Sequence, residues 1–168
     1  HFSFDTYSLG VPHVHGGHKY VWGAVDRHSK LFWIRLMKKK SEAGDALREY
    51  DTFCKANGVE CKSGHADSAT EFVGEHSSVQ AWFRERGLPF TTAVEYEPRG
   101  NGLCERRWRM LGRWIRNALN CSKLPRNYAG HAATHCTWVS WRIPDRRTGK
   151  TPWELFTGEK PECMIVRP

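Results

Sequence analysis

Apolar residues recur at steps of three and four between positions 101 and 120, in the stretch NGLCERRWRMLGRWIRNALN. This spacing predicts one long amphipathic helix whose apolar stripe faces a core. The dipeptide Asn101-Gly102 is a turn signal just before it, and Asn101 is predicted to cap the helix. The predicted core stripe consists of Cys104, Trp108, Leu111, Ile115 and Ala118.

The opposite side of this predicted helix is basic. At ~100° per residue, Glu105 falls on the border between the two faces, with Arg109 and Arg116 beside it. The simplest interpretation of Glu105 alone is a surface acid paired with Arg109 at i+4, a contact worth roughly 0.2–0.5 kcal/mol. The arginines of the basic face are Arg106, Arg109, Arg113 and Arg116.

Shorter patterns along the chain predict a single α/β domain. Alternating or continuous apolar runs indicate strands over residues 1–7, 19–26, 31–37, 61–66 and 88–92. Helices are expected from a cap at Ser41 to Gly58, over 79–86, and over 126–141 after Pro125, before a turn-rich tail. A three-stranded meander followed by alternating helices and strands predicts a five-stranded mixed sheet flanked by helices.

The composition favours a folded domain with a polyanionic partner. The chain carries 26 Lys and Arg against 18 Asp and Glu, a net charge of +8, which favours nucleic acid. An apolar content of 39% is sufficient for a core. No window approaches the ~18 apolar residues of a membrane span, so no membrane partner is expected. The chain opens on His1 rather than Met, which indicates a piece of a longer protein.

Cysteines and histidines give weak metal signals. The six cysteines are scattered without a CxxC pair, a pattern of reduced structural thiols. The group His131, His135 and Cys136 falls in a predicted helix, where packing explains these side chains better than zinc. A second group occupies the glycine-rich turn GVPHVHGGH and is only weak support for a metal: His13, His15 and His18.

Three carboxylates from three predicted elements form the candidate catalytic site. Asp5 lies in the first strand, Asp67 follows the fourth, and Glu105 opens the long helix. If the first and fourth strands are neighbours, Asp5 and Asp67 lie close together. Carboxylates suit hard divalent cations, and two such ions ~3.5–4 Å apart can activate an attacking oxygen and stabilise a leaving one.

The sequences around these acids resemble the integrase core of copia-type retrotransposons. HADSATEF, YEPRGNGLCERRWRML and GKTPWELFTGEKP are similar to the family patterns SDNGxEF, YTPQQNGxAERxNRxL and GKTPYELWxGxKP, in the same order. The resemblance runs from about Phe4 to Pro161 and includes VDRHSKLFWIRLMKKKSEA. It implies a retroviral-type integrase catalytic core of ribonuclease H-like fold over residues 1–161, with a C-terminal linker starting at 162–168.

The resemblance also implies a chemistry and its partners. Asp5, Asp67 and Glu105 match the metal-binding acids of the family, which implies two Mg²⁺ or Mn²⁺ ions. The implied enzyme processes the 3′ ends of element DNA and joins them to target DNA. A homo-oligomer is expected, acting in the nucleus after a cytoplasmic particle stage. The acids that match no ligand position are Asp26, Glu71, Glu95 and Glu97.

Departures from the family patterns support an alternative function. Ser68-Ala69 stands where the family has Asn-Gly, and Trp108 stands where it has Asn. A decayed or host-adopted copy that binds nucleic acid without catalysis is therefore the second hypothesis. Ala69 in place of Gly matters only if that position requires a positive φ. The residues predicted to contact DNA are Arg99, Asn101, Arg106, Arg109 and Arg113.

Overall fold

A mixed five-stranded sheet forms the centre of the molecule. The computed structural model describes residues 1–74, 77–93 and 101–162. The strand order is β3-β2-β1-β4-β5, and each strand overlaps its predicted range. The strands are β1 (Phe2–Ser8), β2 (Tyr20–Asp26), β3 (Phe32–Met37), β4 (Gly64–Ala66) and β5 (Phe90–Thr92).

Strand β1 is the central strand, and it pairs with one antiparallel and one parallel neighbour. It is antiparallel to β2, which is in turn antiparallel to β3. On its other side β4 runs parallel to it, with Phe2 opposite Gly64 and Ser3 opposite His65. Strand β5 continues this parallel half of the sheet. The first and fourth strands are therefore neighbours, which is the condition under which Asp5 and Asp67 lie close together.

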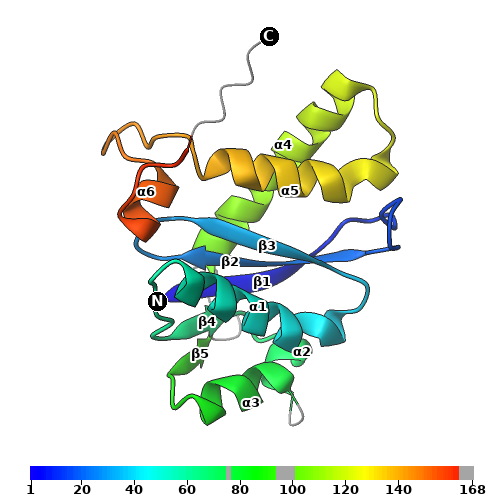
Figure 1. Cartoon of the computed structure of the whole chain (residues 1–168). Helices are drawn as coiled ribbons and strands as arrows, with labels where there is room; N and C mark the ends of the chain where they lie inside the picture. Colours follow the sequence, from blue (N-terminus) through cyan, green and yellow to red (C-terminus); the bar gives the residue numbers. More distant parts are fainter. Residues whose placement is uncertain (75–76, 94–100, 163–168) are drawn as a thin grey trace.

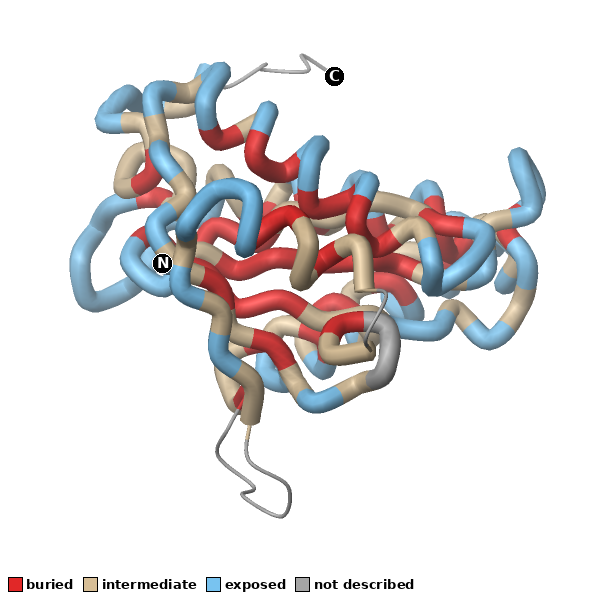
Figure 2. The backbone as a smooth tube through the Cα atoms, turned by 90° about the horizontal axis from the view of Figure 1, so that it is seen from below, coloured by how far each residue is buried: buried red, intermediate tan, exposed pale blue. Residues whose placement is uncertain are grey.

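Helices cover both faces of the sheet (Figure 1). Residues of α1 (Ala43–Ala56) and α3 (Ser78–Glu85) belong to one hydrophobic core, and those of α4 (Gly102–Ser122) and α5 (Ala129–Ser140) belong to another. Figure 2 shows the strands as the most buried layer between them. The shorter helical segments are η1 (Lys40–Glu42), α2 (Thr70–Val73), η2 (Arg126–Tyr128) and α6 (Pro152–Thr157).

Strand β2 supplies side chains to both cores because successive residues point to opposite faces. Trp22 and Ala24 pack in the core beneath α1 and α3. Val21 and Val25 pack in the core beneath α4 and α5. All four side chains are fully buried, which explains the continuous apolar run in the sequence.

The same alternation decides which side chains of β1 face α4. Phe2 and Phe4 belong to the core beneath α1 and α3, where Phe4 is fully buried. Ser3 and Asp5 consequently point to the opposite face, toward α4. One strand thus contributes aromatic rings to one core and a carboxylate to the other side of the sheet.

Helix α4 approaches the sheet closely through Trp108, which is 5% exposed. The indole contacts Phe32 edge-on, at 5.0 Å between centroids, and stacks on Tyr7 at 5.3 Å with 16° between the planes. A Cβ placed on Gly23 of β2 would lie 2.7 Å from this indole and 2.6 Å from the Phe32 ring. The absence of a side chain at Gly23 is therefore what lets the indole lie against the sheet.

Gly23→Ala is expected to lower the free energy of unfolding by about 1–3 kcal/mol, because the added methyl overlaps two buried rings. Gly102→Ala is the matched control, since a Cβ there meets nothing within 4 Å and alanine favours a helix. Chemical denaturation of both variants measures the difference. A Gly23→Ala protein as stable as the parent would show that α4 does not pack against this part of β2.

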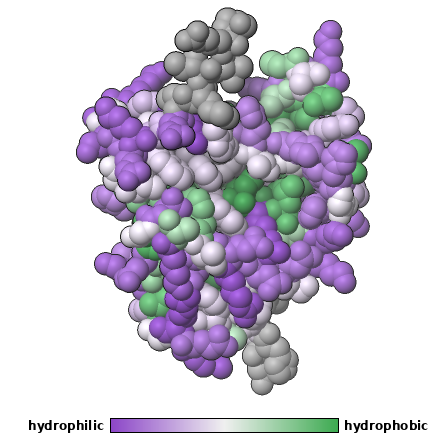
Figure 3. Space-filling view, in the orientation of Figure 1, coloured by the Kyte–Doolittle hydropathy of each residue, from purple (hydrophilic) through white to green (hydrophobic). Residues whose placement is uncertain are grey.

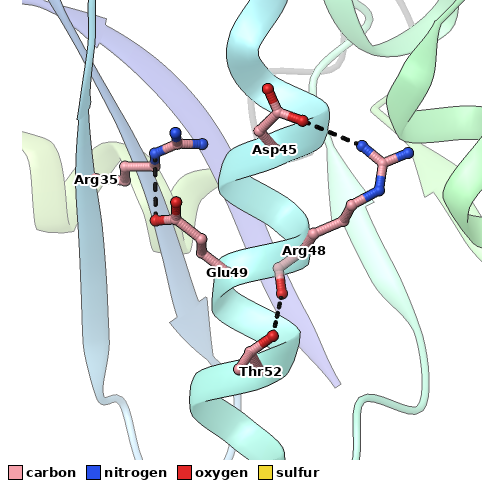
Figure 4. A network of polar contacts seen from close by, with 5 residues as sticks. All are labelled: Arg35, Asp45, Arg48, Glu49 and Thr52. Atoms are coloured by element: carbon pink, nitrogen blue, oxygen red, sulfur yellow. Dashed lines mark hydrogen bonds and ion pairs between the residues drawn. The ribbon is translucent and has the colours of Figure 1, made fainter.

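Polar contacts on the outer surface of α1 connect it to β3 (Figure 4). Arg35 Nε lies 3.2 Å from Glu49 Oε2, and Arg48 Nη1 lies 3.3 Å from Asp45 Oδ1. The Thr52 hydroxyl donates a hydrogen bond of 2.9 Å to the Arg48 carbonyl. Exposed ion pairs of this kind contribute little to stability, so these positions suit control substitutions.

Three local predictions were wrong or incomplete. Ser41 lies inside η1 rather than capping α1. Asn101 occupies the N-cap position of α4, but its side chain makes no capping hydrogen bond. The tail predicted as turns contains α6, where Thr151 accepts a hydrogen bond from the Glu154 N–H and Pro152 begins the helix. A Thr-Pro pair is an N-cap signal, but here it stands among turn-forming residues, so the short helix was not predicted.

The buried stripe of α4 differs from the predicted one at its end. Cys104, Trp108, Leu111 and Ile115 are buried as predicted. The predicted fifth member, Ala118, is only half-buried, and its place is taken by Leu119.

The surface seen in Figure 3 is mainly hydrophilic, with apolar side chains gathered near the middle of that face. Among the described residues, no helix combines the length and apolar character needed to cross a membrane.

Candidate active site and nucleic-acid interface

Asp5 is presented by the central strand. Its side chain is half-buried on the face of β1 that looks toward α4. Oδ1 accepts a hydrogen bond of 2.6 Å from the Thr6 N–H. The fully buried ring of Phe4 on the opposite face fixes the strand that carries this carboxylate.

Asp67 directly follows β4, and its Oδ1 accepts a hydrogen bond of 3.2 Å from the Ala69 N–H. The parallel register of β1 and β4 pairs Ser3 with His65. Continued by two residues, this register sets Asp67 level with Asp5 and on the same face of the sheet, because side chains repeat every second residue.

Glu105 stands in the first turn of α4 and is exposed. A carboxylate is favoured at this end of a helix because the free N–H groups there are partially positive. Asn101 is 7% exposed, and its Nδ2 donates a hydrogen bond of 3.1 Å to the Phe4 carbonyl. This bond ties the start of α4 to β1 beside Asp5, which positions Glu105 relative to the strand.

The thiol of Cys104 is buried in α4 beside Glu105. Burial raises its pKa well above the ordinary value, and the charge of Asp5 raises it further. Arg27 lowers it, while Asp67 and Glu105 add smaller increases. These contributions are consistent with Asp5 and Asp67 lying on the face of the sheet that α4 covers, and Glu105 follows Cys104 directly in α4.

The acids are not arranged as a ready-made metal site. Across residues 1–74, 77–93 and 101–162, no group of three or more His, Cys, Asp or Glu side chains is set to hold a metal ion. The chemistry of the donors nevertheless fits Mg²⁺, which prefers carboxylate oxygens and keeps several water ligands. The donor set fits a hard divalent ion, although its geometry is not preformed.

The competing acids have other surroundings or lie outside the described residues. Asp26 Oδ2 accepts hydrogen bonds from the Ser29 hydroxyl at 2.7 Å and from the Ser29 N–H at 2.6 Å, which closes the turn between β2 and β3. Glu71 lies in α2, and its side chain is not described. Glu95 and Glu97 fall in the undescribed segment 94–100.

The departure at Ala69 imposes no backbone strain. The non-glycine residues with positive φ in the described chain are Lys30 and Lys123, so Ala69 adopts an ordinary conformation. A glycine is therefore not required at this position. Trp108, a further departure, is accommodated against Gly23 and supports α4 rather than disturbing it.

A basic track runs along α4 away from Glu105. Arg109, Arg113 and Arg116 are exposed and line a hollow of about 270 Å³ together with Tyr7. A second hollow of about 270 Å³ continues it and adds Arg126 beyond Arg116. Cationic side chains around a shallow trough are suited to the phosphates of a nucleic-acid backbone.

The predicted DNA contacts have different positions in the structure. Arg106 is exposed beside Glu105, and Arg109 and Arg113 belong to the track. Asn101 is buried and bonded to β1, whereas Arg99 lies outside the described residues.

Sequence reasoning missed Tyr7, whose ring is 38% exposed above Trp108. The strand pattern could have predicted this position of Tyr7, because a residue two positions after Asp5 in a strand lies on the same face as Asp5. The position of Arg126 could not be predicted in this way, since Arg126 follows α4 after a turn and joins the track only through the packing of η2.

Known proteins share this fold and part of this sequence. No protein-family model matches the chain. The Retrovirus-related Pol polyprotein from transposon TNT 1-94 of Nicotiana tabacum is 23% identical over 130 residues, which is 77% of this chain. The chain spans only 10% of the length of that polyprotein.

Solved integrase structures superpose on the whole domain at low identity. The HTLV-2 integrase catalytic core domain in complex with magnesium (trimeric form) has a TM-score of 0.67 and 18% identity, covering 92% of this chain and 94% of that one. The catalytic core domain of BIV integrase has a TM-score of 0.63 and 17% identity, covering 92% and 91%. A simian T-cell lymphotropic virus intasome in complex with PP2A regulatory subunit B56 gamma has a TM-score of 0.75 and 18% identity, covering 99% and 59%.

The sheet order and flanking helices define the ribonuclease H-like fold of retroviral integrase catalytic cores. In the three motifs and in its match to the transposon polyprotein, the chain is similar to the integrase catalytic core of copia-type retrotransposons.

Proposed function

We propose that this domain cuts and joins DNA during integration of a retrotransposon, as a metal-dependent polynucleotidyl transferase. The observation that carries this function is the placement of the three acids: Asp5 on β1, Asp67 directly after the neighbouring parallel strand β4, and Glu105 in the first turn of the helix that Asn101 ties to β1. The basic track that starts beside Glu105 gives the site a surface for the substrate. The magnesium named for the HTLV-2 core supports the same cofactor here.

Each part of the site has a separate task in this proposal. The carboxylates of Asp5, Asp67 and Glu105 hold divalent ions, which when bound supply activation of the attacking oxygen and stabilisation of the leaving oxygen. The backbone bonds to Asp5 and Asp67 hold these carboxylates in position. The bond from Asn101 to β1 sets the distance of Glu105 from the strands. Arginines of α4 bind the DNA backbone without reading its sequence.

A branched DNA substrate that mimics the joined product tests this function. We expect the domain to resolve it in the presence of Mg²⁺ or Mn²⁺ and to stop when a chelator is added. A folded protein that binds the branch but leaves it intact with either ion would contradict catalysis by this domain. It would support the binding-only alternative, which the ordinary conformation at Ala69 and the structural relatives do not favour.

The neighbours also support a multimer as the working form. The HTLV-2 core is described in dimeric and trimeric forms, and the simian virus protein is part of an intasome. We infer that this domain likewise acts as a homo-oligomer on DNA, in the nucleus.

Neutralising the track is expected to weaken DNA binding in a salt-dependent way. Arg109→Gln with Arg113→Gln removes two cations, so the slope of log affinity against log salt falls by ~1.8 for duplex DNA. Arg48→Gln with Arg84→Gln is the matched control, because these arginines are exposed on α1 and α3, beyond the other face of the sheet. Fluorescence anisotropy across a salt series measures both. Equal slopes for the two double variants would place the DNA elsewhere.

A further inference from the structure

The hairpin between β1 and β2 docks against the beginning of α5, far along the sequence (Figure 1). The Val14 N–H donates a hydrogen bond of 2.8 Å to the Asn127 carbonyl in η2. Within the loop, the His13 N–H donates a bond of 2.8 Å to the His18 carbonyl. The tip of the hairpin is thus held against the segment that leads into α5.

This docking assembles four imidazole rings that the sequence keeps in two groups. The His13 and His131 rings lie 4.4 Å apart, and the His15 and His131 rings lie 5.2 Å apart, between centroids. His13 is 6.0 Å from both His15 and His18. His131 therefore joins the hairpin histidines rather than His135 and Cys136 of its own helix.

His13 is the buried member of the cluster, at 5% exposure. Its Nδ1 lies 2.5 Å from the His15 carbonyl oxygen and 3.0 Å from the His15 backbone nitrogen. The shorter contact, to an oxygen that can only accept, needs a proton between its atoms, so we assign Nδ1 as the donor. Nε2 then carries a lone pair. This atom is buried and has no hydrogen-bond partner in the described part of the chain. A histidine oriented through one nitrogen by a backbone carbonyl, with the other free, is the usual state of a metal ligand.

Gly130 explains how the rings come together. A Cβ at this position would lie 2.1 Å from His13 Cδ2 and 2.8 Å from Nε2. The imidazole is therefore seated directly on the backbone of α5. The next residue is His131, so this seat sets its ring beside His13.

The ring spacings lie on either side of the spacing of histidines that share one ion. With Zn–N bonds of ~2.0–2.1 Å in a tetrahedral site, the centroids of two ligating imidazoles lie ~5.2 Å apart. The three distances among His13, His15 and His131 are 4.4, 5.2 and 6.0 Å. The described side chains are not preset as a metal site. His15 and His131 are exposed, so their rings are free to turn toward His13 without disturbing the core.

We propose that His13, His15 and His131 bind one borderline divalent transition-metal ion such as Zn²⁺, with His18 or water as a fourth ligand. Imidazole nitrogens select such ions, whereas the carboxylates near Cys104 select hard Mg²⁺. The bound ion clips the β1–β2 hairpin to α5 and so stabilises the fold. This site is separate from the proposed active site and does not rest on its catalysis.

Metal titration of the domain without a polyhistidine tag tests the site. After chelator treatment, Co²⁺ is added and the visible absorption of tetrahedral cobalt is recorded, followed by competition with Zn²⁺. We expect one ion per chain and a rise in melting temperature with Zn²⁺ that Mg²⁺ does not produce, since only a ligand of the folded state stabilises it.

His131→Gln and His15→Gln are expected to weaken Zn²⁺ affinity at least ~100-fold, because even the outer partners of a metal ligand are worth ~10–100-fold. His135→Gln is the matched control, an exposed histidine on the same helix, and should bind like the parent. His13 is left unchanged because its removal from a buried position disturbs packing. No saturable ion in the parent, or equal affinities for His131→Gln and His135→Gln, would overturn the proposal.

Discussion

Glu105→Gln and Asp67→Asn are each expected to abolish DNA joining, with a rate loss of roughly 10³-fold or more, about 4 kcal/mol in the activation free energy. Both changes keep the size of the side chain and remove the negative charge that holds a divalent ion. The resolution of branched DNA with Mg²⁺ and Mn²⁺ is the measurement. Exposed Glu105 makes few packing contacts, so the loss should occur in a protein as stable as the parent.

Asp45→Asn is the matched control for this result. Asp45 is an exposed carboxylate on α1, and its only described ion pair is the surface contact with Arg48. Its variant should keep full activity and DNA binding. If Glu105→Gln retained the parental rate with either metal, the three acids would not be the catalytic group, whatever the DNA affinity of the domain.

Trp108→Ala is expected to cost about 3–5 kcal/mol of unfolding free energy, the usual penalty for emptying a large aromatic site. The indole is 5% exposed and packs between Tyr7 and Phe32 while filling the space above Gly23. The loss should loosen α4 and thereby also reduce DNA joining. Urea denaturation gives the free energy of unfolding.

A double-mutant cycle separates this contact from general damage. Gly23→Ala overlaps the indole in the parent, but in the Trp108→Ala protein its methyl enters space that the indole has left. We expect its cost to become smaller there, although the overlap with the Phe32 ring remains, with a coupling energy of roughly 1–3 kcal/mol between the two positions. Additive costs would show that the two residues are not in contact. Gly102→Ala, which should be additive with Trp108→Ala, completes the comparison.

Much of the fold was predictable because it rests on strong local patterns. The apolar runs of β2 and β3 and the spacing of Cys104, Trp108 and Leu111 repeat at the period of their elements. The pairing of β1 with β4 was a possibility that a mixed sheet allows, and the structure shows it. The sequence alone therefore allowed the expectation that Asp5 and Asp67 lie close together. That they act as metal ligands stays a prediction.

The rest depended on tertiary contacts that local sequence does not encode. Asn101 has the chemistry of a helix cap, yet its amide bonds to the Phe4 carbonyl because β1 lies within reach. Leu119 rather than Ala118 is buried at the end of α4, since helix packing and not the average period decides the last turn. The meeting of His13 with His131 required the hairpin to reach α5, and no motif links these two segments.

The parallel pairing of β1 with β4 has a kinetic consequence. Phe2 and Gly64 face each other across a loop that includes two strands and α1. A contact so distant in sequence forms slowly, because the entropy of closing the loop opposes it until the pairing is complete. The hairpin of β1 and β2 can form early, but Asp5 meets Asp67 only after this later step. We therefore expect the acids to assemble among the last events of folding, so that variants that slow β4 docking delay activity more than they delay the appearance of secondary structure.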